Sequence, residues 1–265
     1  MNAALYAVGS YVTAYIPSPW GIGQFRPAVV IPAFFAVIFG PWVGGVGAAL
    51  GTLIADSVKH GGLYLGSLLA AVPGNFIGFF LFGYLLRKKF NWARFITVTN
   101  VALVLSNLIV AFLYVYAYKL LYAQASAFTQ LTGDALIVLS LGLTIFWFVT
   151  MLPFVLLLVP ALIVATAHAF PSIVREDVRA NQMKLPPQRL LGLSMLVPGI
   201  IMIVIALTIT YASFGSYLST GFAGYFPLAT FTLIQLLLYA GGCSLSVLGG
   251  IFIVKKNTSL NSESS

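Results

Sequence analysis

Charged residues are what this sequence has least of. Asp, Glu, Lys and Arg make up only 7% of its 265 residues, and just five of them are acidic. A soluble domain normally carries about 25% charged residues. Apolar residues make up 60% of the chain, and the mean hydropathy is +1.03. Such a chain cannot cover a surface that faces water, so we expect an all-α membrane helix bundle whose main solvent is the lipid bilayer.

Cysteine pairs and the common catalytic motifs are also missing. The single Cys243 lies in an apolar run, which excludes a disulfide framework and a cysteine-based metal site. The sequence contains no HExxH, GxSxG or P-loop motif. His60 and His168 are predicted on opposite sides of the membrane, where they cannot share a metal ion. We therefore expect no enzyme activity, no metal site and no cofactor.

Positive charge is present but concentrated. The formal net charge is +8, yet no array of basic and aromatic residues suited to reading bases accompanies it, so no nucleic-acid partner is expected. Ten of the thirteen Lys and Arg residues lie within 87–94, 175–189 and 255–256. Basic loops stay on the cytoplasmic side of a membrane. With eight spans these three places share one side, which predicts a multi-pass cell-membrane protein with both termini in the cytoplasm.

Eight apolar runs approach the roughly 20 residues that a membrane-spanning helix needs. They cover residues 2–17, 26–40, 42–58, 63–86, 95–122, 134–169, 188–212 and 224–254. The run 134–169 contains two prolines, and we expect one long helix there, because a split would move the basic segment after it to the outer side. The short runs within 26–58 fit either two helices or a re-entrant hairpin.

The expected organisation follows from these runs. A six-helix bundle covers residues 1–170 and a cytoplasmic loop covers 171–187. Two additional transmembrane helices follow over 188–254, and a disordered cytoplasmic tail covers 255–265. The apolar N-terminus lacks the basic region and cleavage site of a secretory signal, so we interpret it as a retained first helix.

Glycine recurs every three or four residues in the stretch FGPWVGGVGAALGTLIAD. Gly40, Gly44, Gly47 and Gly51 would form a face of small residues, which lets a second helix approach closely. Helix association explains these glycines without any ligand. Asp56 at the end of the stretch is different, because an ionisable group at the edge of an apolar helix is costly and indicates a function.

Four charged side chains are predicted in the outer half of the membrane, namely Arg26, Asp56, Lys59 and Lys119. They would suit an anionic or electronegative ligand, and Arg26 can hold a carboxylate with two hydrogen bonds. Simpler interpretations remain open. Asp56 can form an ion pair with Arg26 or Lys59, and Lys119 can extend to the lipid headgroups.

Amides and aromatic residues occur within the middle helices. Asn75 and Asn107 need hydrogen-bond partners in lipid and should therefore face protein. Tyr114 and Tyr118 are four residues apart, which places them on one helix face, and Trp147 lies within the long helix. These residues are consistent with interhelical hydrogen bonds and an interfacial aromatic belt. They are equally consistent with a pocket that has aromatic walls and a few polar groups, which is typical of a small-molecule site.

The order of these features resembles the substrate-binding S component of energy-coupling factor (ECF) vitamin transporters. The resemblance covers about residues 1–170. It rests on an alanine-containing first helix with a Pro/Gly-rich loop after it, on the glycine-rich stretch quoted above, and on the segment GSLLAAVPGNFIGFFLFGYLLRKK. The run of FGP, glycines and Asp is the most specific of these signals. The last two helices are additional to the six-helix S fold, and the resemblance assigns them no role.

The resemblance implies an outward-facing vitamin pocket built from the fourth to sixth helices. The loop between the first two helices would cap it. In this chain the corresponding parts are Asn75, the Asn107–Tyr118 face, Trp147 and the loop Pro17–Arg26.

The resemblance also implies partner proteins. The first helix of an S component docks on a membrane-embedded coupling subunit through an A-x-x-x-A motif, which Ala3 and Ala7 match here, with Ala4 beside them. The S component then topples in the membrane, driven by two ATPases on separate chains. This arrangement would explain why the chain has no nucleotide motif of its own.

The sequence thus predicts a membrane substrate-binding subunit for uptake of a small water-soluble nutrient, a vitamin or its precursor. It would work with a coupling subunit and two ATPase subunits. The candidate substrate-binding residues are Arg26, Asp56, Lys59, Asn75, Asn107, Tyr114, Tyr118, Lys119 and Trp147. Two alternatives stay open: a self-sufficient secondary transporter, and a structural or assembly membrane protein without a ligand.

Overall fold

The computed structural model describes residues 1–182, 186–222, 225–226 and 229–262. The regular secondary structure in these ranges is helical, and an isolated β-bridge joins Pro17 to Gln24. Five helices are long and apolar enough to cross a membrane: Ser67–Arg87, Trp92–Tyr122, Gly133–Ala169, Gln188–Tyr211 and Ala229–Val254. The predicted all-α, multi-pass membrane bundle is confirmed.

Six helices form the core bundle. They are α1 (Asn2–Thr13), α2 (Val30–Phe39), α3 (Pro41–Lys59), α4 (Val72–Arg87), α5 (Trp92–Phe112) and α7 (Gly133–Ala169). A 3-10 turn, η1 (Pro27–Val29), leads into α2. Two wide π-helical turns extend α4 and α5: η2 (Ser67–Ala71) precedes α4, and η3 (Leu113–Tyr122) follows α5. A short helix, α6 (Ser126–Thr129), lies between η3 and α7.

Gly40 separates α2 from α3. Its φ of 96° lies in the left-handed region that glycine adopts without strain, and Pro41 then begins α3. The run 26–58 therefore forms two helices. Gly40 belongs to the turn between them, so the prediction that it joins the small-residue face was wrong. A positive φ ends one helix before the next begins.

The remaining glycines of α3 allow close contacts with its neighbours. A Cβ atom at Gly47 would lie 2.0 Å from Nδ2 of Asn2, and one at Gly51 would lie 2.7 Å from the ring of Tyr6. Asn2 donates a hydrogen bond from Nδ2 to the carbonyl of Val43 at 2.7 Å. Larger residues would separate the backbones of α1 and α3. The predicted role of these glycines in helix association is confirmed.

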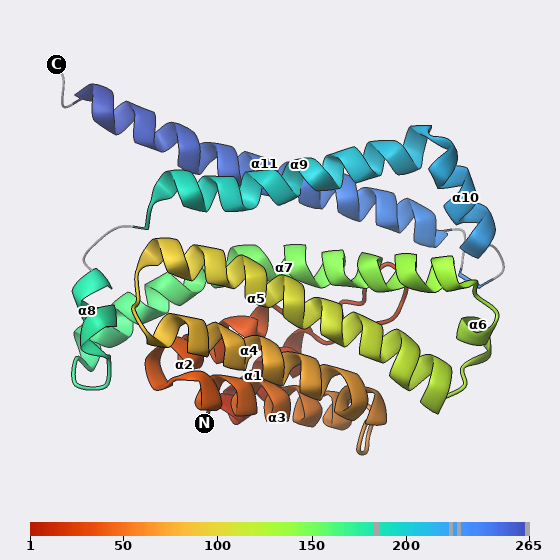
Figure 1. The fold of residues 1–265 in the computed structure, drawn as a ribbon, viewed down its shortest axis with the longest axis horizontal. Coiled ribbons are helices and arrows are strands. Elements are labelled where there is room, and N and C mark those ends of the chain that lie inside the picture. The colour runs from red at the N-terminus through yellow and green to blue at the C-terminus, as the bar shows by residue number, and fades with distance from the viewer. Residues whose placement is uncertain (183–185, 223–224, 227–228, 263–265) are drawn as a thin grey trace.

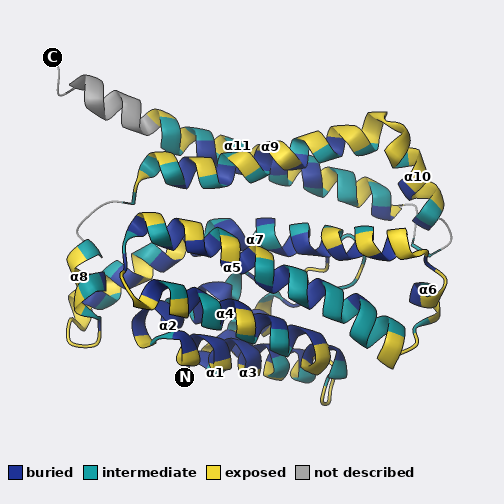
Figure 2. Ribbon diagram, viewed as in Figure 1, coloured by how far each residue is buried: buried dark blue, intermediate teal, exposed yellow. Residues whose placement is uncertain are grey.

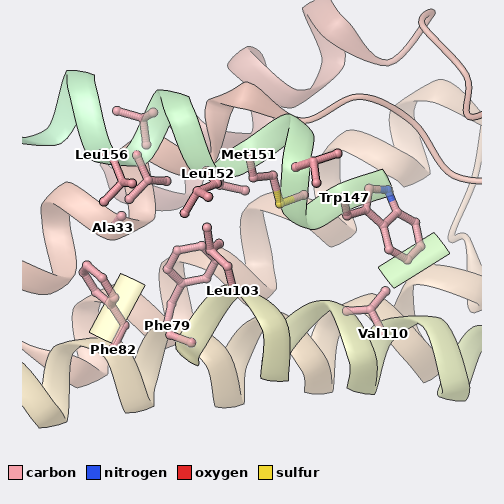
Figure 3. Close-up of a cluster of buried hydrophobic side chains, with 14 of the residues drawn as sticks. Ala33, Phe79, Phe82, Leu103, Val110, Trp147, Met151, Leu152 and Leu156 are labelled. Atoms are coloured by element: carbon pink, nitrogen blue, oxygen red, sulfur yellow. The ribbon is translucent and has the colours of Figure 1, made fainter. Parts of the chain in front are cut away.

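The long run before residue 170 forms one helix, as predicted. Helix α7 contains 37 residues and includes Pro153 and Pro160. At 1.5 Å per residue it is about 55 Å long, so it extends beyond a hydrocarbon core of about 30 Å. Its buried side chains complete the centre of the core together with residues from α2, α4 and α5, including Ala33, Phe82 and Leu103 (Figure 3).

Helices α9 (Gln188–Tyr211), α10 (Ser213–Phe222) and α11 (Ala229–Ser262) follow the core bundle. Gly192 lies against Gly249, and Gly199 lies against Gly242, so α9 and α11 form a tightly associated pair. This pair runs over α7 and α5, on the far side of the core from α1 and α3 (Figure 1). Many of its outward residues are exposed, as expected for helices that face lipid (Figure 2).

Two predicted loops contain helices. Helix α10 lies in the interval between the predicted runs 188–212 and 224–254, and α8 (Glu176–Gln182) lies within the expected loop 171–187. Helix α11 also continues to Ser262, because no Gly or Pro interrupts it after residue 254. The prediction of a disordered tail over 255–265 is not tested by this assignment, and residues 263–265 lie outside the described part of the chain.

The bundle has two distinct ends. The basic end carries the turn between α4 and α5, helix α8, the start of α9 and the end of α11, and the N-terminus lies toward it (Figure 1). The cavity end carries the loop 14–26 between α1 and η1, the turn 60–66 before η2, and α6. The basic loops thus share one end of the bundle, as an even number of crossings between them requires.

Candidate functional site

A cavity of about 300 Å³ opens at the cavity end of the core bundle. We call it the polar cavity, because amide, hydroxyl and charged groups contribute to its lining alongside aromatic rings. Its walls come from the loop 14–26, the end of α3, both π-helical turns, and the facing parts of α4, α5 and α7. Its volume lies at the lower end of the range typical of small-molecule sites.

The floor of the polar cavity combines amides with apolar groups. Trp147, Met151 and Val110 belong to the buried core and also line the cavity, so the core ends where the cavity begins (Figure 3). Asn107 lies 3.7 Å from the sulfur of Met151, measured from its Nδ2 atom. Oδ1 of Asn75 accepts a long hydrogen bond of 3.5 Å from Ser106. These weak contacts leave both amides with hydrogen-bonding capacity for a ligand.

The two π-helical turns form one wall. Wide turns of this kind are rare and occur frequently at functional sites. Here η2 contributes Ser67 and Ala71 to the cavity lining, and η3 contributes Tyr114 and Lys119. The hydroxyl of Ser67 is buried, with only 1% of the residue exposed, and it has no hydrogen-bond partner among the described residues. A buried hydroxyl without a partner costs free energy, which a ligand with a suitable polar atom would recover.

Aromatic rings cluster near Tyr64, in the turn before η2. Its hydroxyl lies 3.2 Å from the hydroxyl of Tyr114. Its ring stacks on His60 with a centroid distance of 3.8 Å and meets Tyr118 edge-on at 5.7 Å. The ammonium group of Lys119 lies 5.5 to 5.8 Å from three ring centroids, those of Tyr114, Tyr118 and Phe128. Lys119 is therefore held beside the cavity by cation–π contacts.

Gln24 fastens the loop 14–26 over the cavity. Its Nε2 donates to Asp56 at 2.9 Å, and its Oε1 accepts from Lys59 at 2.7 Å. Its backbone carbonyl accepts a hydrogen bond of 3.1 Å from the indole nitrogen of Trp147. Gly23 allows this contact, because a Cβ atom there would lie 2.5 Å from the same indole ring. One residue thus joins the loop to both α3 and α7.

Arg26 and Asp56 form a buried ion pair. Arg26 also donates a hydrogen bond to the hydroxyl of Thr52. Of the open interpretations of Asp56, pairing with Arg26 is the one that the structure contains. The positive charge of Arg26 is therefore compensated inside the chain, which leaves Lys59 and Lys119 as the other cationic groups beside the cavity.

Eight of the nine predicted binding residues line the polar cavity. They are Arg26, Asp56, Lys59, Asn75, Asn107, Tyr114, Lys119 and Trp147. Tyr118 is not part of the lining, and its ring contacts Tyr64 and Lys119 behind it. Sequence reasoning missed Gln24, Tyr64 and Ser67. Gln24 lies in a glycine-containing loop, and Tyr64 and Ser67 lie at the start of a helix, so no sequence pattern connects them. Only the tertiary structure brings them together.

The three alanines of α1 point in different directions. Ala7 is only 5% exposed, because it lies on the face of α1 that packs against the core. Ala3 is half-buried, and its carbonyl lies close to Gly51. Ala4 is exposed and lies on the outward face with Val8. The Ala3-x-x-x-Ala7 match thus points largely toward α3, and Ala4 is the alanine that a separate subunit can reach.

Comparison with known proteins identifies the group to which this fold belongs. A family model described as the ECF-type riboflavin transporter, S component, matches residues 1–162. No curated protein and no solved structure matches the chain. The matched region includes every described residue of the polar cavity and ends within α7. This chain is a member of the S-component family of ECF-type riboflavin transporters, the membrane-embedded substrate-binding subunits of vitamin uptake systems.

Proposed function

We propose that this chain binds riboflavin in the polar cavity and delivers it across the membrane with separate ECF subunits. The family match carries the choice of vitamin, because its description names riboflavin. The lining of the cavity supports it. Riboflavin joins a flat heteroaromatic ring system to a chain of hydroxyl groups, and the cavity offers both aromatic rings and polar side chains.

The ring system would lie against aromatic side chains at the inner part of the cavity. Trp147 and Tyr114 supply flat surfaces for stacking. Asn75 and Asn107 each carry donor and acceptor groups that suit the alternating nitrogen and carbonyl groups at the edge of a flavin ring. The unpartnered hydroxyl of Ser67 supplies one further hydrogen bond.

Closure of the site would depend on the loop 14–26. Gln24 holds this loop through Asp56, Lys59 and Trp147. Entry and release of a ligand then require these hydrogen bonds to break and reform. Asp56 lies on α3 and is also paired with Arg26. This ion pair holds the carboxylate to which Gln24 bonds in a fixed position.

The coupling subunit would contact α1 and α3 on their exposed faces. The outward face of α1 carries Ala4, Leu5, Val8 and Val12. Beside it, α3 presents an exposed apolar stripe of Val43, Val46, Leu50, Ile54 and Val58. Small and apolar residues suit close helix contacts within a membrane. Two ATPase subunits on separate chains would supply the energy.

We place the basic end of the bundle in the cytoplasm of the cell, with both termini there. The basic loops gathered at that end support this orientation. The polar cavity then opens on the outer side of the cell membrane, where a nutrient is captured. Cysteine labelling at Gly62 and at Arg94 tests it: Gly62→Cys should react with an impermeant thiol reagent added outside, and Arg94→Cys should not.

The binding proposal is tested with the full-length chain in detergent or nanodiscs. Riboflavin fluorescence should fall as the ligand stacks on protein rings, and thiamine should not compete. Asn107→Leu should weaken binding by about 0.5–1.5 kcal/mol, the value of one hydrogen bond. Asn100→Leu is the matched control, because Asn100 lies on the same helix, bonds to the carbonyl of Ile96 and does not line the cavity. Absence of riboflavin binding by the unmodified chain would refute the proposal.

Transport distinguishes this function from a self-sufficient carrier. Vesicles that contain this chain alone should bind riboflavin without accumulating it, whatever ion gradient is applied. Accumulation should require the coupling subunit, the ATPase subunits and ATP. Sustained uptake by the chain alone would show a secondary transporter instead.

A further inference from the structure

A second cavity, of about 260 Å³, lies between the core bundle and the C-terminal helices α9–α11. We call it the apolar cavity. Helix α7 supplies one wall, with Val138, Leu141 and Gly142, and α9, α10 and α11 supply the opposite wall. Trp20, from the loop that caps the polar cavity, contributes to its lining. The family match ends at residue 162, so the wall built from α9–α11 is a feature additional to the matched region.

The chemistry of the apolar cavity excludes a polar occupant. None of its described lining residues is charged, and Thr230 carries the only side-chain hydroxyl among them. A buried water needs two to four polar partners, which this lining does not offer. If the cavity were empty, the side chains around it would lose dispersion contacts on that side.

The apolar cavity is continuous with the surface that faces lipid. Leu141 and Phe214 line the cavity, yet they are 44% and 42% exposed. Ile137, one turn before Leu141 on α7, is exposed to the same extent on that surface. Because the chain spans a bilayer, acyl chains cover these exposed residues and can enter between α7 and the C-terminal helices from the side.

We propose that an acyl chain of a membrane lipid occupies the apolar cavity. An acyl chain is narrow, flexible and wholly apolar, so it suits a lateral opening and a lining without hydrogen-bonding demands. A helix of a second copy, with a diameter of about 10 Å, is too wide for a cavity of 260 Å³. The C-terminal helices thereby form one half of a lipid-binding site.

The lipid contacts the loop of the polar cavity through Trp20. The indole of Trp20 lies on α7, because a Cβ atom at Gly142 would be 2.6 Å from its ring. The residues directly after it, Gly21 to Gln24, line the polar cavity. Trp20 therefore has the apolar cavity on one side and continues into the capping loop on the other. An acyl chain in this cavity supports the loop from behind.

Fluorescence quenching in defined lipid tests this proposal on the full-length chain. The protein is placed in nanodiscs of dioleoyl phosphatidylcholine and of the same lipid with dibrominated acyl chains. Bromine quenches tryptophan at contact range, and the Trp20 signal is the difference between the unmodified chain and Trp20→Phe. We expect strong Trp20 quenching that rises in proportion to the brominated fraction, because a single site exchanges one acyl chain for another of equal affinity.

Variants that fill the cavity provide the decisive comparison. Val138→Phe on α7 and Thr230→Leu on α11 add volume from opposite walls, and each should lose most of the Trp20 quenching. Ile137→Phe is the matched control and should keep it, because Ile137 faces lipid outside the cavity. Size-exclusion chromatography checks that each variant is folded. The two positions lie on different helices, so a folding defect in one leaves the other informative.

Three outcomes would overturn the lipid site. Equal quenching in the filled variants and the control would mean that Trp20 meets only surrounding lipid. Quenching in the unmodified chain that already saturates at a low brominated fraction would mean the same, because several lipids then reach the ring at once. An unquenched Trp20 in particles of doubled mass would show that a second copy covers this face. None of these outcomes depends on riboflavin binding, so they are independent of the proposed transport function.

Discussion

Trp147 donates a hydrogen bond from its indole nitrogen to the backbone carbonyl of Gln24, a residue 123 positions earlier in the chain. This contact ties the middle of the longest helix to the loop that covers the polar cavity. The same indole ring lines the cavity. A single side chain therefore lines the cavity and also holds the loop beside it.

Replacing Trp147 by Phe should shorten the residence time of riboflavin. The substitution keeps an aromatic ring but removes the hydrogen bond to Gln24, which is worth about 0.5–1.5 kcal/mol. Stopped-flow fluorescence should show dissociation faster by roughly two- to tenfold at 25 °C, with a smaller change in the association rate. An unchanged dissociation rate would mean that this bond does not hold the loop. Trp92→Phe is the control, because Trp92 bonds to Asn181 near the basic end.

Replacing Asp56 by Asn should strongly destabilise the fold. Asp56 compensates the buried charge of Arg26, and removal of one partner of a buried pair costs about 3–5 kcal/mol. Thermal unfolding in detergent should show a large loss for Asp56→Asn. Asp134→Asn is the control, since Asp134 is exposed. The double change Arg26→Met with Asp56→Leu should recover much of the loss, because neither charge then remains buried alone.

Replacing Gly51 by Ala should weaken the contact between α1 and α3. The added methyl group would lie 2.8 Å from the carbonyl of Ala3 and 2.7 Å from the ring of Tyr6. Overfilled contacts of this kind cost about 1–3 kcal/mol. Gly250→Ala in α11 meets open space and should leave the melting temperature unchanged or raise it. A neutral result for Gly51→Ala would show that α1 can move away from α3 without cost.

Acidification should release α8 from the turn between α4 and α5. Burial opposes the ionisation of Asp177, but hydrogen bonds from Arg175 and from the backbone N–H of Phe90 outweigh it and hold the pKa of Asp177 below its ordinary value. A depressed pKa contributes stability above the unfolded-state value of about 4, and this stability is lost as the pH falls through the folded-state pKa. Asp177→Asn should therefore melt lower than the unmodified chain at neutral pH, and the difference should vanish in acid. A constant difference at all pH values would contradict this linkage.

Bulky residues on α1 should separate docking from binding. Ala4 is exposed and Ala7 is buried. Ala4→Trp should abolish uptake by the complete transporter and leave riboflavin affinity unchanged, because it obstructs only the outward face. Ala7→Trp should lower the melting temperature itself, because the ring cannot fit between α1 and the core. Normal uptake by Ala4→Trp would remove α1 from the docking surface.

Composition and charge placement were sufficient to predict the membrane bundle. The apolar runs indicated all eight main helices, since a helix satisfies its own backbone hydrogen bonds in lipid and length then follows from membrane thickness. The positions of basic residues indicated which loops share an end. The glycine spacing on α3 indicated a close helix contact. Helices α8 and α10 escaped prediction, because the formation of short helices depends on local capping and tertiary contacts.

The polar cavity was predicted only in outline. Scarce polar residues stand out in an apolar sequence, so Asn75, Asn107 and Lys119 were recognisable as candidates. Their neighbours were not, because Gln24 and Ser67 look ordinary until loop and helices converge.

The tertiary structure determines which charged residues form pairs. Asp56 had two possible basic partners in the sequence, and the fold places Arg26 against it while Lys59 turns to Gln24. The direction of each alanine on α1 likewise depends on which face meets α3. The sequence determines which polar residues need a hydrogen-bond partner in lipid. The packed helices determine which of these residues bond to one another, because a hydrogen bond needs its partners within about 3 Å.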